Sequence, residues 1–299
     1  MPINLSKLDQ RLLSAAAHGN LVPFVGSGVS RHATTSDPKA FPTWIGLLTE
    51  LEQIAESKGY IRPEERTQIQ DLVNSGKFLM AAQALRSVLP NDLLDQVLRD
   101  RFNPPDALPG ALHRAILQLR PALIITTNYD LLLEDAFAQE YRKVPQSLTY
   151  KEAPAVQAIL QSHRQWVDRP TIFKIHGSAL NPAEAILAEL DYRNLLYREP
   201  GYRMVLSAVF VTKVVLMIGF SFQDPEIRFV LEGLRDSLKY RSSPDYIVLP
   251  ADANNSVERV RWRQDFGIDT IEYEPSPDHH ELVELVEHLV HQVPSDAHC

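Results

Sequence analysis

Apolar runs and helical patterns alternate over much of the chain. About six short runs are rich in β-branched or aromatic side chains and mostly apolar on both faces, as expected for buried strands. They cover residues 21–25, 122–126, 171–175, 214–218, 246–249 and 268–273. Strands of this kind form parallel sheets that helices cover on both sides. The pattern therefore predicts an α/β fold with a doubly wound, mostly parallel, Rossmann-like sheet of about six strands.

Between the first two predicted strands, helical patterns follow one another without a strand. They cover residues 44–59, 63–74, 77–89, 92–102 and 108–119. Thr43 is placed to cap the first of these helices. We therefore expect a single domain over residues 1–299 with a helical insert at residues 41–120. The polar stretch at residues 31–40 is expected to be either an ordered loop over a ligand or a mobile lid.

The first predicted strand runs directly into Gly26-Ser27-Gly28. Glycines let the chain turn sharply, and their free N–H groups, with a helix beginning near Val29, could receive a pyrophosphate. A plain tight turn explains the same residues. Arg31 stands where the usual dinucleotide fingerprint has its third glycine, which argues against an ordinary dehydrogenase.

Polar residues follow the next predicted strands at the point where each ends. Thr127, Asn128 and Asp130 follow the second strand, His176 the third, and the segment 219–224 the fourth. Taken singly, helix capping explains the asparagine and the aspartate, and a turn histidine explains His176. Ligands of doubly wound sheets bind at the carboxyl ends of the strands. Capping does not account for a histidine at this edge, so the combination favours a ligand site.

Composition limits the binding partners and the cellular location that we expect. A formal net charge of -8 gives no basic surface for nucleic acid, so no direct nucleic-acid binding is expected. Cys299 is the only cysteine, which excludes an internal disulfide and a four-cysteine zinc site and fits a cytoplasmic location. The chain shows neither a signal peptide nor an apolar run of membrane-spanning length, so no membrane association is expected.

Four motifs, in order, resemble those of the sirtuin family. Residues 26–30 are similar to the Gly-Ala-Gly-x-Ser loop, with serine for alanine, and residues 127–130 to Gln-Asn-x-Asp, with threonine for glutamine. His176-Gly177 matches the sirtuin His-Gly, and residues 219–221 match the later Gly-x-Ser. The resemblance extends from about Leu21 to about Val290.

The chain is more similar to the sirtuin-like NAD hydrolase domains of bacterial anti-phage defence systems. The additional similar segments are residues 42–44, 187–192, 219–227 and 262–273. Deacylating sirtuins carry Pro-Asp-Phe-Arg where residues 42–45 read Pro-Thr-Trp-Ile, and they carry a four-cysteine zinc module. Both departures argue against deacylation.

The resemblance implies a hydrolase that cleaves NAD to nicotinamide and ADP-ribose as the effector of an anti-phage defence system. NAD is then the substrate, and no zinc or other metal is required. The catalytic residues implied are Asn128 and His176, the histidine as a base at the ribose hydroxyls. The implied NAD-binding residues are Gly26, Ser27, Gly28, Ser30, Thr127, Asp130, Gly219 and Ser221.

Other functions and partners follow from the same resemblance. The alternatives are an NAD-dependent protein deacylase or ADP-ribosyltransferase, and a non-catalytic nucleotide-binding subunit of a defence complex. Unregulated loss of NAD would kill the host, so we expect a homo-oligomer and a separately encoded regulatory partner such as an ATPase or a nucleic-acid sensor. Apolar stripes in the predicted insert, such as Leu93, Leu94, Val97 and Leu98, either pack internally or form subunit contacts.

Overall fold

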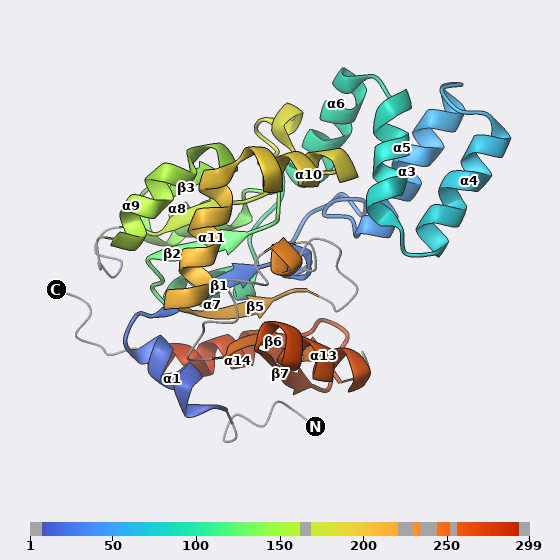
Figure 1. Cartoon of the computed structure of the whole chain (residues 1–299). Coiled ribbons are helices and arrows are strands. Elements are labelled where there is room, and N and C mark those ends of the chain that lie inside the picture. The colour runs from blue at the N-terminus through green and yellow to red at the C-terminus, as the bar shows by residue number, and fades with distance from the viewer. Residues whose placement is uncertain (1–7, 162–168, 221–229, 234–243, 252–255, 293–299) are drawn as a thin grey trace.

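The computed structural model describes residues 8–161, 169–220, 230–233, 244–251 and 256–292. Its seven strands form one parallel sheet in the order β3-β4-β2-β1-β5-β6-β7 (Figure 1). The strands are β1 (Leu21–Val25), β2 (Leu123–Thr126), β3 (Gln146–Thr149), β4 (Thr171–Lys174), β5 (Val214–Ile218), β6 (Asp245–Pro250) and β7 (Ile268–Tyr273). Because β1 lies between β2 and β5, the chain winds away from β1 in both directions. The predicted doubly wound parallel sheet is confirmed.

The sheet has one more strand than the sequence predicted. β3 lies at an edge and pairs only with β4 among the described strands. Leu148 is its one buried residue. An edge strand needs few apolar residues, because one side of it faces water. A search for apolar runs therefore misses it.

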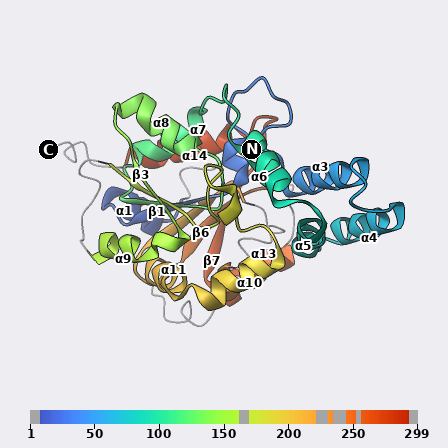
Figure 2. The same ribbon diagram turned by 90° about the horizontal axis from the view of Figure 1, so that it is seen from above.

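Helices cover both faces of the sheet. One face carries α9 (Ala153–Gln161), α10 (Glu189–Arg198), α11 (Pro200–Thr212) and α13 (Ser256–Phe266), and the other carries α1 (Gln10–Ala17), α7 (Ala111–Gln118), α8 (Leu132–Tyr141) and α14 (Glu281–Val290). Figure 2 shows α7, α8 and α14 on the opposite side of the strands from α9, α10 and α11. No helix in the described ranges combines the length and the apolar character that crossing a membrane requires.

Four helices form a bundle beside the sheet (Figure 1). They are α3 (Trp44–Ser57), α4 (Pro63–Asn74), α5 (Phe78–Val88) and α6 (Asn91–Phe102). The bundle has its own apolar core, which also includes Tyr129 and Leu187 from loops of the sheet domain. Thr43 caps α3 as predicted, since its Oγ1 accepts a hydrogen bond from the backbone N of Gly46 at 3.2 Å. α7 packs on the sheet with α8 and α14 instead of joining the bundle.

Candidate functional site

The loops after β1 and β5 meet at the point where the winding direction changes. The N–H of Gly26 donates to the carbonyl of Ile218, and that of Gly28 to the carbonyl of Gly219, each at 2.9 Å. A Cβ atom on Gly28 would lie 2.8 Å from the Cα of Gly219, and one on Gly219, at φ +79°, would lie 2.7 Å from the backbone N of Val29. These glycines therefore allow two backbones to touch. The expectation that the N–H groups of Gly26 and Gly28 are free for a pyrophosphate is wrong.

The helix after the glycine loop is short. α2 (Ser27–Ser30) begins at Ser27, ahead of the predicted start near Val29. Ser27 is exposed, and Ser30 is buried. The loop can therefore contact a ligand through two hydroxyl groups, the exposed one of Ser27 and the buried one of Ser30.

A hydrogen-bond chain joins the glycine loop to the loop after β2. Asn128 Nδ2 donates to the carbonyl of Gly26 at 3.0 Å and to Ser30 Oγ at 2.9 Å. Ser30 Oγ donates in turn to Asp130 Oδ2 at 2.6 Å. The other carboxylate oxygen of Asp130 accepts from the backbone N of Leu132, the first residue of α8, at 3.1 Å. The N-cap position of α8 is Leu131, so Asp130 lies one residue before the cap and is close to the glycine loop.

Two side-chain oxygens of this loop are buried without a partner. Thr127 Oγ1 and Asn128 Oδ1 have no hydrogen bond within the described part of the chain. Buried polar atoms are normally paired, so such acceptors are suited to a ligand or a water molecule. The amide orientation of Asn128 is fixed, because its Nδ2 must face the carbonyl of Gly26.

Two pockets flank the start of α3. The inner cavity, of about 40 Å³, lies among Ser27, Ser30, Thr127, Asn128 and Asp130, and its apolar walls are Phe41, Pro42, Trp44, Leu47, Phe102, Tyr129 and Leu187. The outer pocket, of about 450 Å³, lies between the glycine loop and the ends of β6 and β7. Ser27, Thr43 and Trp44 line both. Ligand pockets commonly measure about 300–1,000 Å³, so the inner cavity is nearly closed in this conformation.

Histidines stand on the wall of the outer pocket. His32 and His279 line it, and Tyr273 OH lies 2.8 Å from His279 Nδ1. Burial lowers the pKa of His32, and His279 lowers it further. The imidazole of His32 is therefore neutral at neutral pH and can act as a hydrogen-bond donor or acceptor there.

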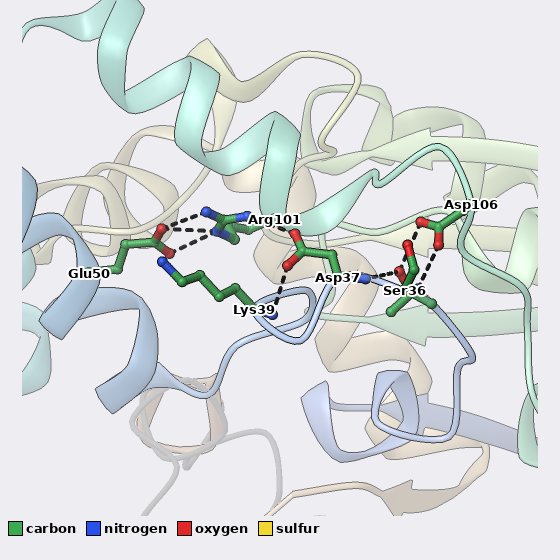
Figure 3. Close-up of polar contacts among 7 residues, drawn as sticks. Ser36, Asp37, Lys39, Glu50, Arg101 and Asp106 are labelled. Carbon is green, nitrogen blue, oxygen red and sulfur yellow. Dashed lines mark hydrogen bonds and ion pairs between the residues drawn. The ribbon is translucent and has the colours of Figure 1, made fainter.

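The segment between the glycine loop and α3 is ordered by charged groups of α3 and α6 (Figure 3). Arg101 contacts Glu50 through Nε, at 2.9 Å from Oε2, and Asp37 through Nη1 at 2.8 Å. Its carbonyl also accepts from the N–H of Phe41 at 2.9 Å. Asp106 accepts from the backbone N of Ser36 at 2.6 Å, and hydrogen bonds from Ser36 lower the pKa of Asp106 to about 2. These contacts connect the segment to α6 and to the loop that follows it.

The end of this segment is strained. Phe41 has φ +50° and precedes Pro42. A bulky residue in the left-handed region costs about 1–3 kcal/mol and persists only where its surroundings hold it. The Arg101 contacts provide that hold, and they place Phe41 on the wall of the inner cavity beside Asn128.

His176 lies outside both pockets. It is 0% exposed, and its ring packs edge-on against Tyr192, with centroids 4.9 Å apart. Tyr192 OH lies 3.5 Å from His176 Nδ1, and the backbone carbonyl of His176 accepts from Ile186 N at 2.9 Å. Neither pocket includes His176 in its lining. The structure thus gathers Ser27, Ser30, Thr127, Asn128 and Asp130 at the inner cavity without this histidine.

The predicted glycines lie at or below the outer pocket. Gly28 and Gly219 line this pocket, and Gly26 lies beneath it against Phe220. Ser221 lies outside the described residues.

Sequence reasoning missed Lys174, whose side chain is 2% exposed next to the Asp130 loop. A lysine at the end of an otherwise apolar strand was the available signal. Among the described residues, no group of three or more His, Cys, Asp or Glu side chains could hold a metal ion.

Comparisons with known proteins identify several relatives. NAD(+) hydrolase ThsA of Bacillus cereus (strain MSX-D12) is 26% identical over 231 residues, which are 77% of this chain and 43% of that protein. NAD(+) hydrolase ThsA of Acinetobacter baumannii (strain 532279) is 25% identical over 238 residues, 80% of this chain and 44% of that protein. Defense-associated sirtuin 2 of Bacillus subtilis is 25% identical over 235 residues, 78% of this chain and 21% of that protein. The chain spans less than half the length of each of these relatives.

One solved structure and one family model also match this chain. A solved structure from "Structural Basis for the Mechanism and Regulation of Sir2 Enzymes" aligns with 12% identity and a TM-score of 0.43, over 95% of this chain and 97% of that chain. The family model described as SIR2-like domain matches residues 122–271, half of the chain. That stretch contains Asn128, Asp130 and His176. The chain belongs to the SIR2-like domain family.

Proposed function

We propose that this chain is an NAD glycohydrolase that cleaves NAD to nicotinamide and ADP-ribose. The observation that carries the proposal is Asn128 Oδ1, a buried acceptor without a partner in the described residues, held beside the inner cavity. Relatives of this chain that are named NAD(+) hydrolase support the choice of substrate.

Cleavage of NAD mainly requires that the protein position the substrate. The bond between the ribose C1′ and the nicotinamide nitrogen breaks, and its electron pair leaves with nicotinamide, which becomes neutral. Water adds to C1′, and one proton is released to solvent. The protein must orient the ribose and stabilise the oxocarbenium-like transition state. Asn128 Oδ1 would accept a hydrogen bond from the attacking water or from a ribose hydroxyl.

The two pockets suit the two halves of the dinucleotide. In this proposal the nicotinamide enters the inner cavity between aromatic walls, with Asp130 and Thr127 at its polar end. The adenosine diphosphate part lies in the outer pocket along Ser27, Gly28 and Gly219. Since the inner cavity is about 40 Å³, the wall formed by Phe41 and Trp44 must retract when NAD binds.

His176 is proposed as the base at the ribose hydroxyls. Its ring is fully buried against Tyr192, so it reaches a substrate only after α10 or the loop before it moves. A retracting wall and a moving α10 belong to one rearrangement, because Leu187, just before α10, packs in the core of the helical bundle. Catalysis by His176 therefore requires the opened state.

The biological role that we propose is that of a defence effector. The relative named Defense-associated sirtuin 2 supports this role. We propose a cytoplasmic homo-oligomer whose helical insert, residues 41–120, contributes subunit contacts, and a separately encoded partner that triggers the opened state. A nearly closed inner cavity agrees with weak activity before that trigger.

One experiment tests the proposed activity. Purified protein is incubated with NAD over a range of protein concentrations, and nicotinamide and ADP-ribose are quantified by chromatography. We expect equal amounts of both products, and a rate about 100-fold lower for Asn128→Ala. Asn74→Ala, at the end of α4 and away from both pockets, is the matched control and should keep the wild-type rate. Formation of acetylated ADP-ribose from an acetyl-lysine peptide would favour deacylation instead, and ADP-ribose attached to protein would favour ADP-ribosyl transfer.

A further inference from the structure

The side chain of Lys174 is buried directly behind the Asp130 loop. Lys174 ends β4 and is 2% exposed. Alternation along the strand directs it to the same face as Ile172, the face covered by α8. Its Nζ donates to the backbone carbonyl of Asp130 and lies 3.5 Å from Glu134 Oε1. The ammonium group thus connects the end of β4 to the start of α8.

The fold alone does not explain a lysine at this position. Removing an ammonium group from water is costly, and replacing a buried ion pair by apolar side chains is often neutral or stabilising. The neighbouring residues on this face are apolar, among them Ile172, Leu133 and Phe137. A methionine of similar length would fit such a site. The ammonium group of Lys174, through its charge or its hydrogen bonds, therefore has a role other than packing.

The contacts of Lys174 lead to the candidate catalytic residue. Lys174 holds the carbonyl of Asp130, and the carboxylate of Asp130 accepts from Ser30 Oγ at 2.6 Å. Ser30 Oγ accepts from Asn128 Nδ2 at 2.9 Å. A displacement of Asp130 would therefore move Ser30 and release the amide of Asn128.

Lys174 also counters a concentration of negative charge. The carboxylates of Asp130, Glu134 and Asp135 lie around the start of α8. Burial raises the pKa of Asp135, Glu134 and Asp130 raise it further, and Lys174 lowers it. Without the ammonium group, mutual repulsion would push Asp130 away from its place beneath the inner cavity.

We propose that Lys174 is a positioning residue for the nicotinamide end of the site, acting through the backbone of Asp130 to hold Asn128 in its fixed orientation. This inference rests on the proposed NAD glycohydrolase function. Lys174 touches neither pocket, so its effect must appear in the step at the nicotinamide bond and not in the binding of the rest of the dinucleotide.

The test compares Lys174→Met with Lys213→Met. Lys213 precedes β5 at the opposite edge of the sheet, where its Nζ lies 3.2 Å from Asn20 Oδ1. We expect Lys174→Met to lower kcat for nicotinamide release about 100-fold, as displacements of about 1 Å do. The Kd of Lys174→Met for ADP-ribose, which lacks nicotinamide, should stay within about twofold of the wild-type value. Lys213→Met should keep both the kcat and the Kd of the wild type.

Two further variants separate positioning from folding. Lys174→Met leaves Glu134 buried opposite an apolar side chain, so Lys174→Met/Glu134→Gln removes both charges and should fold and melt near the wild-type temperature. We expect this double variant to remain slow, because the carbonyl of Asp130 still lacks its donor, and Lys174→Arg to recover part of kcat. Wild-type kcat in the double variant would overturn the inference.

The outcomes also separate the inference from the function on which it rests. A wild-type protein that neither cleaves NAD nor binds ADP-ribose contradicts the proposed function. A wild-type protein that cleaves NAD, with Lys174→Met as fast as Lys213→Met, contradicts only the role of Lys174.

Discussion

The hydroxyl of Ser30 donates to the carboxylate of Asp130 at 2.6 Å, and the two residues are 100 positions apart in the chain. Ser30 follows β1 and Asp130 follows β2, so this bond joins the loops of neighbouring strands at the carboxyl edge of the sheet. Ser30 also accepts from Asn128, which makes its hydroxyl the link between the asparagine and the aspartate.

Replacing Ser30 should therefore disconnect the site. Ser30→Ala removes both hydrogen bonds and leaves buried polar groups unpaired, which costs about 1–3 kcal/mol of unfolding free energy. At temperatures where the variant is still folded, we expect its rate of NAD cleavage to be at least about 10-fold below that of the wild type. Ser87→Ala, an exposed serine of α5, is the control. Chemical denaturation and nicotinamide release measure the two effects, and a fully active Ser30→Ala would contradict the arrangement.

The glycines of the two touching loops allow a sharper comparison. Gly219 and Gly59 both have positive φ, +79° and +75°, but a Cβ on Gly219 meets the backbone N of Val29 at 2.7 Å while one on Gly59 meets nothing within 4 Å. Gly59→Ala should thus cost only the backbone strain, about 1 kcal/mol. Gly219→Ala adds a backbone collision and should cost at least about 2 kcal/mol more. Equal midpoints in urea denaturation would show that the loops can separate freely.

The sequence predicted the parts of the fold that depend on local patterns. β1, β5 and β7 have the predicted bounds, and β1 and β5 are short runs that are almost fully buried, whereas only the two end residues of β7 are buried. Thr43 caps α3 because the capping geometry is local. The polar residues after β1 and β2 do come together, since parallel strands bring their carboxyl ends to one edge.

What the sequence could not predict depends on contacts between distant segments. The N–H of Gly28 is occupied because the β5 loop packs against it, and no local pattern near residue 28 encodes that neighbour. The burial of His176 against Tyr192 requires the position of α10. Part of the wall of the inner cavity comes from Trp44 and Leu47 of α3 and Phe102 of α6, and the placement of these helices against the sheet is a tertiary contact. For the same reason, the pairing of Arg101 with Glu50 becomes visible only in three dimensions.

Arg101 should control the mobility of the cavity wall. Arg101→Gln removes the side-chain contacts to Asp37 and Glu50, so the strained Phe41 keeps only its hydrogen bond to the backbone carbonyl of residue 101. We expect faster hydrogen exchange in residues 35–44, with α4 unchanged, and a stability loss of about 1–3 kcal/mol. Arg193→Gln breaks an exposed pair with Glu189 and should cost at most about 1 kcal/mol, without a change in exchange at residues 35–44. Unaltered exchange in Arg101→Gln would show that other contacts hold the wall.

His113 should make the fold sensitive to acid. Burial lowers the pKa of His113 to about 3, whereas an unfolded histidine titrates near 6.5. The unfolded chain therefore takes up the proton first as the pH falls. The associated stability is complete above about pH 6.5 and declines toward pH 3, by about 2 kcal/mol between pH 6.5 and pH 5. Denaturation across this range should show a shallower slope for His113→Gln than for the wild type. Identical slopes for the two proteins would exclude His113 as the source.

The last prediction separates catalysis by His176 from packing. Its ring is buried against Tyr192, so His176→Ala removes both a proposed base and an aromatic contact. We expect kcat for nicotinamide release to fall about 100-fold under conditions that open the site, with far-ultraviolet circular dichroism unchanged. Tyr192→Phe keeps the ring contact and removes only the hydroxyl that lies 3.5 Å from His176 Nδ1, so it should stay within a few-fold of wild type. If His176→Ala cleaves NAD at the wild-type rate, the buried position is the whole role of this histidine, and Asn128 with its water accounts for the chemistry alone.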